Sequence, residues 1–402
     1  MEPSAAIDEP QRAALAILRP IVVAIFIGFL MTGLPIAVIP LQVSHALGFG
    51  PVVVGAIVGA QFVASLASRP LAGRLSDGRG AKVAVVTGFT SAAVAGALYI
   101  VSLLFTGIPL VALGVLALAR VALGAAESLV ATGSLAWGVA RLGPARAGIV
   151  MVWVGNAIFA ALAIGAPLGG VLYQRWGFAA VGVAALAVPL AALVILRGIP
   201  NVRPVSGARV PFVAVLRRVA LPGFGLALSS VGFGTITAFV ALLFVARQWA
   251  HPALAFTAFG IAFIAARLRF GELPDRIGGA RVALAAVAVG AIGQGMIALA
   301  ASPLVATLGA ALSGAGYSLA FPAFGVEAVR RAPAQARGAA MGAYIMFLDV
   351  ALGFTGPAAG YVVGVAGYPT MYLASAAVML ASLAVAWILL REAVSQPLPK
   401  MS

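Results

Sequence analysis

Residues 69–82 have the sequence R-P-L-A-G-R-L-S-D-G-R-G-A-K, a short basic and glycine-rich stretch between two long apolar runs. Within it, residues 73–80 form the pattern G-x-L-x-D-x-x-G. The same pattern returns at residues 271–278, again between apolar runs. A chain that repeats one unusual segment in the same context is predicted to consist of two related halves.

The composition excludes a soluble globular protein. Of the 402 residues, 63% are hydrophobic and only 9% are charged, whereas soluble proteins carry about 25% charged residues. The apolar runs last about 20 residues, the length of a spanning helix, and lack the alternation of a transmembrane β-strand. The chain has no cysteine, which excludes disulfides and thiolate metal sites.

We therefore predict an all-α membrane protein with twelve transmembrane helices in two six-helix, pseudo-symmetric halves. The halves are residues 1–197 and 219–402, and residues 198–218 form a cytoplasmic linker. We expect a tether along the anionic leaflet, with a regulatory segment as the alternative. The predicted spans lie near 20–43, 51–72, 83–105, 109–134, 147–170, 178–197, 219–245, 253–270, 281–300, 303–328, 339–362 and 370–390.

The distribution of Lys and Arg predicts the topology. Of 25 such residues, all but Arg120, Arg175 and Arg247 fall in segments that share one side of the membrane. Basic segments stay in the cytoplasm, so both termini are expected there. The net charge of +15 is explained in this way, and no nucleic-acid partner is expected.

The repeat extends beyond the glycine-rich segment. At one constant spacing, Glu127 aligns with Tyr317 and Pro167 with Pro357, while the pair at 177–178 aligns with the pair at 367–368. Parallel six-span halves of this kind place a substrate site at their interface, near the middle of the bilayer.

The repeated halves and several motifs resemble the major facilitator superfamily. The motifs are G-R-L-S-D-G-R-G-A-K at 73–82, D-R-I-G-G at 275–279, G-A-P-L-G at 165–169 and F-L-D-V-A-L-G-F-T-G-P at 347–357. The last three are similar to a bacterial branch often labelled arabinose-efflux permeases. The resemblance implies a rocker-switch secondary transporter of small organic molecules, often driven by protons, in the inner membrane of a bacterium.

The resemblance also implies that the two glycine-rich segments form gates that latch the halves together. The alternative is a topology anchor with a solvated run of charges. The second segment is less complete, because Ala280 stands where the first has a lysine. The gating residues expected are Gly73, Asp77, Arg79, Gly80 and Lys82 in the first segment, and Gly271, Asp275 and Arg276 in the second.

Arg120 and Glu127 are charged residues inside one predicted span. They lie seven residues apart, hence on one helical face, and charges at that depth normally face a cavity or a partner. The family pattern Arg-x-x-x-Gly matches Arg120 and Gly124 and implies a role in proton coupling. We predict that Glu127 accompanies it as the titratable group. The alternative is a structural pair that fixes this span to a neighbour.

Asp349 is a third intramembrane charge, near the middle of the predicted span 339–362. An unpaired aspartate there costs about 3 kcal/mol on insertion scales. We predict a proton or substrate role, with a structural hydrogen bond as the alternative. Weaker candidates for substrate binding are the polar residues within spans, which also commonly join helices: Gln61, Asn156, Tyr317 and Gln294.

The sequence thus predicts a proton-coupled exporter of a small organic solute, drug-like or sugar-like. It is expected to be a monomer in the bilayer, with no cofactor and a proton gradient as its energy source. Enzymatic, metal-ligating and nucleotide-binding motifs are lacking in the sequence, so no enzyme is expected. The alternatives are a sugar or metabolite importer or facilitator and, from another class, a receptor or scaffold that transports nothing.

Overall fold

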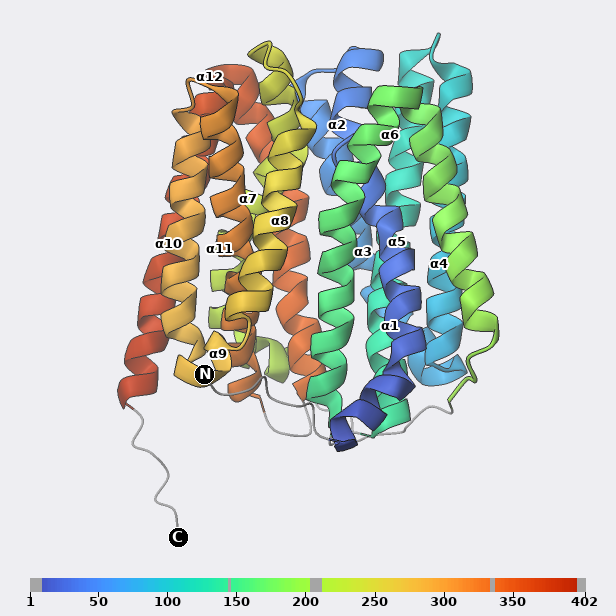
Figure 1. Ribbon diagram of the computed structural model, residues 1–402, viewed down its shortest axis with the longest axis vertical. Helices are drawn as coiled ribbons and strands as arrows, with labels where there is room; N and C mark the ends of the chain where they lie inside the picture. The colour runs from blue at the N-terminus through green and yellow to red at the C-terminus, as the bar shows by residue number, and fades with distance from the viewer. Residues whose placement is uncertain (1–8, 144–145, 203–211, 333–336, 396–402) are drawn as a thin grey trace.

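The computed structural model describes residues 9–143, 146–202, 212–332 and 337–395, and every regular element in these ranges is helical (Figure 1). A π-helical turn at Gln42–Ala46 and a 3-10 turn at Leu103–Phe105 accompany the α-helices. The α-helices are α1 (Glu9–Ile36), α2 (Ile39–Leu41), α3 (Pro51–Arg79), α4 (Ala81–Ser102), α5 (Pro109–Leu142), α6 (Ala147–Arg197), α7 (Phe212–Ala246), α8 (Ala253–Phe270), α9 (Leu273–Ile277), α10 (Gly279–Ala298), α11 (Pro303–Arg330) and α12 (Arg337–Ser395).

Within the described ranges, nine helices are long and apolar enough to cross a membrane by length and composition. Two of them, α6 and α12, each consist of two helical segments that meet at a non-helical glycine, Gly177 and Gly367 respectively. These breaks fall where the sequence predicts one span to end and the next to begin. The all-helical membrane fold is confirmed, and the number of twelve spans stays a prediction.

The backbone repeats at the junctions that the sequence repeat predicts. Gly80 separates α3 from α4 with a φ of 101°, and Gly278 separates α9 from α10 with a φ of 96°. Only glycine adopts such angles without a steric penalty. The two G-x-L-x-D-x-x-G segments therefore end in the same sharp turn, each followed at once by a new helix.

Several boundaries differ from the prediction. α3 continues through the predicted loop to Arg79, so most of the first glycine-rich segment is helical. α5 extends to Leu142, beyond the predicted end at 134. α7 begins at Phe212, inside the predicted linker, and residues 203–211 of that linker lie outside the described residues. Polar and basic residues near the membrane surface do not by themselves end a helix; α3 ends only at Gly80 and α5 only at Gly143, both of which have a positive φ.

The helices form two groups that lie side by side, α1–α6 and α7–α12 (Figure 1). In the first group, a buried apolar core lies between α1, α4, α5 and α6, with Trp137 and Phe89 among its largest side chains. In the second group, a similar core around Phe324 and Tyr344 joins α7, α10, α11 and α12. Each group thus has its own core.

The two ends of the bundle differ in charge. The start of α1, the end of α12 and the short helix α9 lie at the same end (Figure 1). We call it the basic end, because Arg79, Lys82, Arg276 and Arg331 are found there. The opposite end contains the glycine breaks of α6 and α12. Aliphatic side chains such as Ile261, in the middle of α8, are exposed between the two ends, as expected of surfaces that face lipid.

Candidate functional site

An open cavity of about 720 Å³ lies where the two groups of helices meet. Its walls come from α1, α3, α5, α6, α7, α11 and α12. Aromatic and aliphatic side chains form most of the lining. The polar side chains of the lining are Thr32, Ser65, Arg69, Glu127, Ser128, Tyr317 and Asp349. The cavity therefore brings together Glu127 and Asp349, the two acidic residues that the sequence selected.

Asp349 forms an ion pair with Arg69 across the two groups. The Nε and a terminal nitrogen of Arg69 donate to one carboxylate oxygen of Asp349, at 2.7 and 2.5 Å. Ser65 Oγ approaches the same oxygen at 3.5 Å. The side chain of Arg69 is 15% exposed and that of Asp349 is 5% exposed. The pair thus ties α3 to α12 inside a largely buried site.

Arg69 is a correction to the sequence analysis, which placed it in a cytoplasmic segment. It lies inside α3, and its long side chain reaches into the cavity. Because α3 does not end before Arg79, Arg69 lies ten residues, or about 15 Å, inside the end of the helix. The signal was present in the sequence: apolar residues follow Arg69 as well as precede it.

Glu127 is held within the first group of helices. Gln61 on α3 donates its amide to a carboxylate oxygen of Glu127 at 2.7 Å. Gln61 itself is 1% exposed. This neutral partner orients Glu127 without cancelling its charge, so the carboxylate differs from that of Asp349, which has a cation against it.

Arg120 does not pair with Glu127. Its guanidinium donates to the carbonyl oxygens of Ile57 and Val58 on α3, at 3.3 and 3.4 Å, and is 1% exposed. One turn later, a side chain on Gly124 would collide with the carbonyl of Gln61. Arg120 and Gly124 together press α5 against α3, and this contact positions Gln61 beside Glu127.

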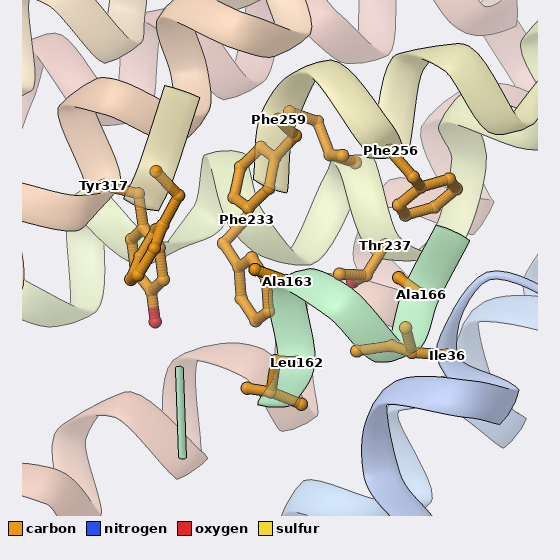
Figure 2. A pocket seen from close by; sticks show the side chains of 11 residues that line it. Ile36, Leu162, Ala163, Ala166, Phe233, Thr237, Phe256, Phe259 and Tyr317 are labelled. Carbon is orange, nitrogen blue, oxygen red and sulfur yellow. The ribbon is translucent and has the colours of Figure 1, made fainter. Parts of the chain in front are cut away.

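A second, more apolar cavity of about 440 Å³ adjoins the first and shares four of its residues, among them Phe233 and Tyr317. Figure 2 shows the rings of Phe233 and Phe259 and the side chain of Tyr317 around this space. Phe233 stacks on Tyr317 with ring centroids 4.7 Å apart, and Phe263 lies 6.2 Å from Tyr317. We call Phe233, Phe259, Phe263 and Tyr317 the aromatic wall.

The sequence analysis selected only Tyr317 from the aromatic wall. The signal for the others is periodicity, because Phe256, Phe259 and Phe263 recur at spacings of three and four residues and so share one face of α8. That pattern alone does not show whether the face lies toward a cavity or toward another helix. In the structure, Phe259 and Phe263 contact the rings of Phe233 on α7 and Tyr317 on α11, and they also line the second cavity.

Close backbone contacts bring the two groups together at the opposite end. On α3 and α12, a side chain added at Gly55 would collide with the carbonyl of Gly356, and one at Gly360 would collide with Pro51. On α6 and α8, Gly260 lies against the carbonyl of Ala163. Helices approach this closely only where side chains are lacking. The bundle is therefore tightly packed at this end.

The predicted gating residues cluster at the basic end, but they are not joined across the groups. Asp77 is exposed, and no hydrogen bond or ion pair links its carboxylate to another described residue. Lys82 donates to the carbonyl oxygens of Ile199 at 2.6 Å and Arg197 at 3.4 Å, so it caps the end of α6. In the second segment, Arg276 pairs with Glu272 at 2.5 Å on an exposed surface.

The remaining candidates are placed as follows. Gln294 lies away from both cavities, 0% exposed, and bonds to Thr235 and Ser313 within the second group. In this structure its amide joins helices, and its predicted substrate contact stays a prediction. Asn156 on α6 lines neither of the two cavities.

The architecture and the site together define a class of protein. Two groups of membrane-spanning helices enclose a cavity with buried charges, and one end of the interface is tightly packed. Among the described residues, no group of three or more His, Asp or Glu side chains is arranged to hold a metal ion. Such a bundle can hold a small molecule between its halves, which is the arrangement of a membrane transport protein.

Comparison with known families agrees that the protein is a membrane transport protein. The model of the Major Facilitator Superfamily matches residues 21–251 and 223–401. The chain belongs to this family and is a multi-pass membrane transporter rather than an enzyme. The two matched ranges overlap, so together they extend over nearly the whole chain.

The relatives match this chain over almost its full length. An uncharacterized MFS-type transporter of Burkholderia mallei (strain SAVP1) is 43% identical over 364 residues, which cover 90% of this chain and 89% of the relative. Another, from Salmonella typhimurium, is 42% identical over 369 residues, covering 92% and 95%. Their descriptions name the family and no substrate.

Solved structures share the fold at low sequence identity. A variant of the nucleoside transporter NupG superposes with a TM-score of 0.72 at 15% identity, covering 93% of this chain and 99% of that one. The human organic anion transporter MFSD10 gives a TM-score of 0.65 at 18% identity, covering 92% and 99%. At these identities the likeness concerns the fold alone.

Proposed function

We propose that the protein is a secondary active transporter that exports a small organic solute in exchange for protons by alternating access. One observation carries the proposal. Two carboxylates inside membrane-spanning helices, the partly buried Glu127 and the buried Asp349, lie in one cavity between the two groups of helices. Intramembrane acids are costly to insert, and they mark proton relays and substrate pathways in transport proteins. No cofactor is required, because the proton gradient supplies the energy.

The two carboxylates have different roles in this proposal. Among the described residues, Glu127 is hydrogen-bonded within the first group, through Gln61. Asp349 holds Arg69 and therefore the second group to the first. Protonation of Asp349 would leave Arg69 without its anion, which weakens the tie between the groups. Arg120, which fastens α5 to α3, keeps Glu127 at a constant depth during the cycle.

Gating is assigned to the basic end. Asp77 and Arg79 belong to the first segment, and Asp275 and Arg276 to its repeat, beside the turns at Gly80 and Gly278. In the opposite conformation, the basic end closes and the glycine contacts of α3 and α12 separate. Charged residues that are exposed here then find partners, as a bistable latch requires. The positive-inside rule places this end and both chain termini in the cytoplasm of a bacterial cell.

The test is solute flux in proteoliposomes under an imposed pH gradient. Glu127→Gln and Asp349→Asn should each abolish pH-driven transport while membrane insertion and thermal stability in detergent are checked separately. Glu392→Gln is the matched control, because Glu392 is an acid at the basic end of α12, 49% exposed and outside the cavity. If both cavity variants keep pH-dependent flux, the proton assignment is wrong. Reversal of the gradient distinguishes export from import.

A further inference from the structure

Three buried polar atoms in or beside the cavity that Glu127 lines have no hydrogen-bond partner among the described residues. They are Thr32 Oγ, Ser128 Oγ and Gln61 Oε1. Thr32 and Ser128 line the cavity and are 2% and 1% exposed. Gln61 borders it through its bond to the carboxylate of Glu127. Buried polar atoms are almost always paired, so unpaired ones beside a cavity indicate a missing partner.

A partner that donates several hydrogen bonds fits these atoms. A carboxylate and an amide oxygen only accept, and a hydroxyl can accept through either of its lone pairs. A primary or secondary organic ammonium carries three or two N–H donors and a positive charge, which suits both the carboxylate of Glu127 and the hydroxyls of Thr32 and Ser128. An organic carboxylate would meet Glu127 with like charge, and an uncharged hydroxyl has a single donor.

The charged residues described on the helices around Glu127 do not act as its cation partner, so an ammonium can take that position. Arg69 on α3 and Asp349 on α12 neutralise each other as an ion pair. Arg120 on α5 is turned to the carbonyls of α3 and does not line the cavity. Arg267 on α8 lies over the ring of Phe263 and lines neither cavity. Among the described residues, no cation forms an ion pair with Glu127, whose carboxylate accepts from Gln61.

The rest of the cavity fits an apolar body. The aromatic wall adjoins the space in front of Glu127, and the two cavities share Ile36, Leu162, Phe233 and Tyr317. Phe233 and Tyr317 stack with an interplanar angle of 2°, which presents broad ring surfaces. Aromatic rings favour organic cations and aromatic bodies over hydrated inorganic ions.

We propose that the substrates are protonated amines with an apolar or aromatic body, bound with the ammonium on Glu127, Thr32 and Ser128 and the body against the aromatic wall. This inference rests on the proposed function and deepens it. The amine and the proton compete for one carboxylate: binding of the ammonium requires that the acid form of Glu127 first releases its proton to water. Exchange of the two ions follows from that competition.

The test uses four probes with one ring system: 1-naphthylmethylamine, its trimethylammonium analogue, 1-naphthylmethanol and 1-naphthoate. Calorimetry on the purified full chain in detergent measures their affinities. The primary amine should bind at least tenfold more tightly than the alcohol, the carboxylate and the trimethylammonium analogue, which has no N–H. Its affinity should rise with pH, because ionised Glu127 attracts the ammonium. Sodium chloride and potassium chloride at equal concentration should compete equally and weakly.

Variants then locate the site. Glu127→Gln should weaken amine binding at least tenfold and remove its pH dependence, whereas Glu392→Gln should leave both unchanged. Thr32→Val and Ser128→Ala, which remove one acceptor each, should weaken the primary amine severalfold and leave the trimethylammonium analogue unaffected. The probe series on the unmodified protein remains decisive if Glu127→Gln does not fold.

Several results would overturn the inference. They are preference for the carboxylate or the alcohol, equal affinity for the two ammonium probes, and competition by sodium alone, which would indicate an inorganic cation site. Proteoliposome flux separates this inference from the proposed function. Preferential amine binding without pH-driven flux would support the site and contradict transport, whereas pH-driven flux of 1-naphthoate without amine preference would support transport and contradict the site.

Discussion

The ion pair between Arg69 and Asp349 permits a quantitative prediction through a double-mutant cycle. The perturbations are Arg69→Met, Asp349→Asn and both together. Removing one partner of a buried ion pair leaves an uncompensated charge and costs about 3–5 kcal/mol. Arg69 is 15% exposed and Asp349 5%, so water relieves part of that penalty. We expect each single variant to lose about 2–4 kcal/mol of stability, and the double variant to lose less than either.

The size of the coupling energy shows whether Arg69 and Asp349 interact as a charged pair or as an uncharged hydrogen bond. An uncharged hydrogen bond between membrane helices contributes about 0.6 kcal/mol on average and about 1.7 kcal/mol at most in such cycles. A charged pair should give a coupling energy of about 2 kcal/mol or more, because the penalty of the orphaned charge disappears when both partners are replaced.

The assay is reversible unfolding in mixed micelles titrated with sodium dodecyl sulfate. A control cycle on Glu272 and Arg276, whose side chains are 78% and 71% exposed, should give a coupling of about 0.3–0.5 kcal/mol. If the coupling for Arg69 and Asp349 is no larger than in the control, the pair does not tie the two groups together, and the proposed role of Asp349 fails with it.

Two predictions concern glycines. Gly278→Ala should lower stability by about 1–2 kcal/mol, because its φ of 96° is unfavourable for alanine. Steric collision does not contribute, since no atom lies within 4 Å of the added carbon. The control is Gly295→Ala: this glycine is helical and equally open, so the substitution should raise stability by up to about 1 kcal/mol in the same unfolding assay. Gly356→Val should prevent closure of the opposite end, because the side chain would meet the backbone of Gly55. A cysteine at Ile36, in a chain with no other, should then react faster with an impermeant thiol reagent from that end, whereas Gly364→Val, with open space around it, should not change the rate.

The sequence alone was sufficient to predict features whose physical cause lies within one segment of the chain. Apolar runs of about 20 residues specify spanning helices regardless of how they pack. The glycines at 80 and 278 specify the same turn twice, because the angle is local to the residue. Glu127 and Asp349 could be selected because an acid inside an apolar run is costly wherever it lies.

Pairing between distant residues could not be predicted in the same way. Arg69 and Asp349 lie in different halves, and nothing in either segment identifies the other as its partner. The same holds for Gln61 and Glu127, which meet only because Arg120 and Gly124 bring α5 against α3. Gln294 is a polar residue within a span, which could bind a substrate as well as join helices. The sequence does not show that residues of neighbouring helices already satisfy its amide.

The two acids of the cavity have different mechanical consequences, which follow from where their partners lie. Glu127 and Gln61 both belong to the first group, so a change of charge on Glu127 breaks no hydrogen bond between the groups. Asp349 and Arg69 belong to different groups, so a change of charge on Asp349 alters that contact directly. Under the proposed function, occupancy by a solute at Glu127 and movement of the two groups are therefore controlled by separate carboxylates in one cavity. Their coupling then passes through the cavity that both line, where the field of one charge acts on the other and a bound cation screens both.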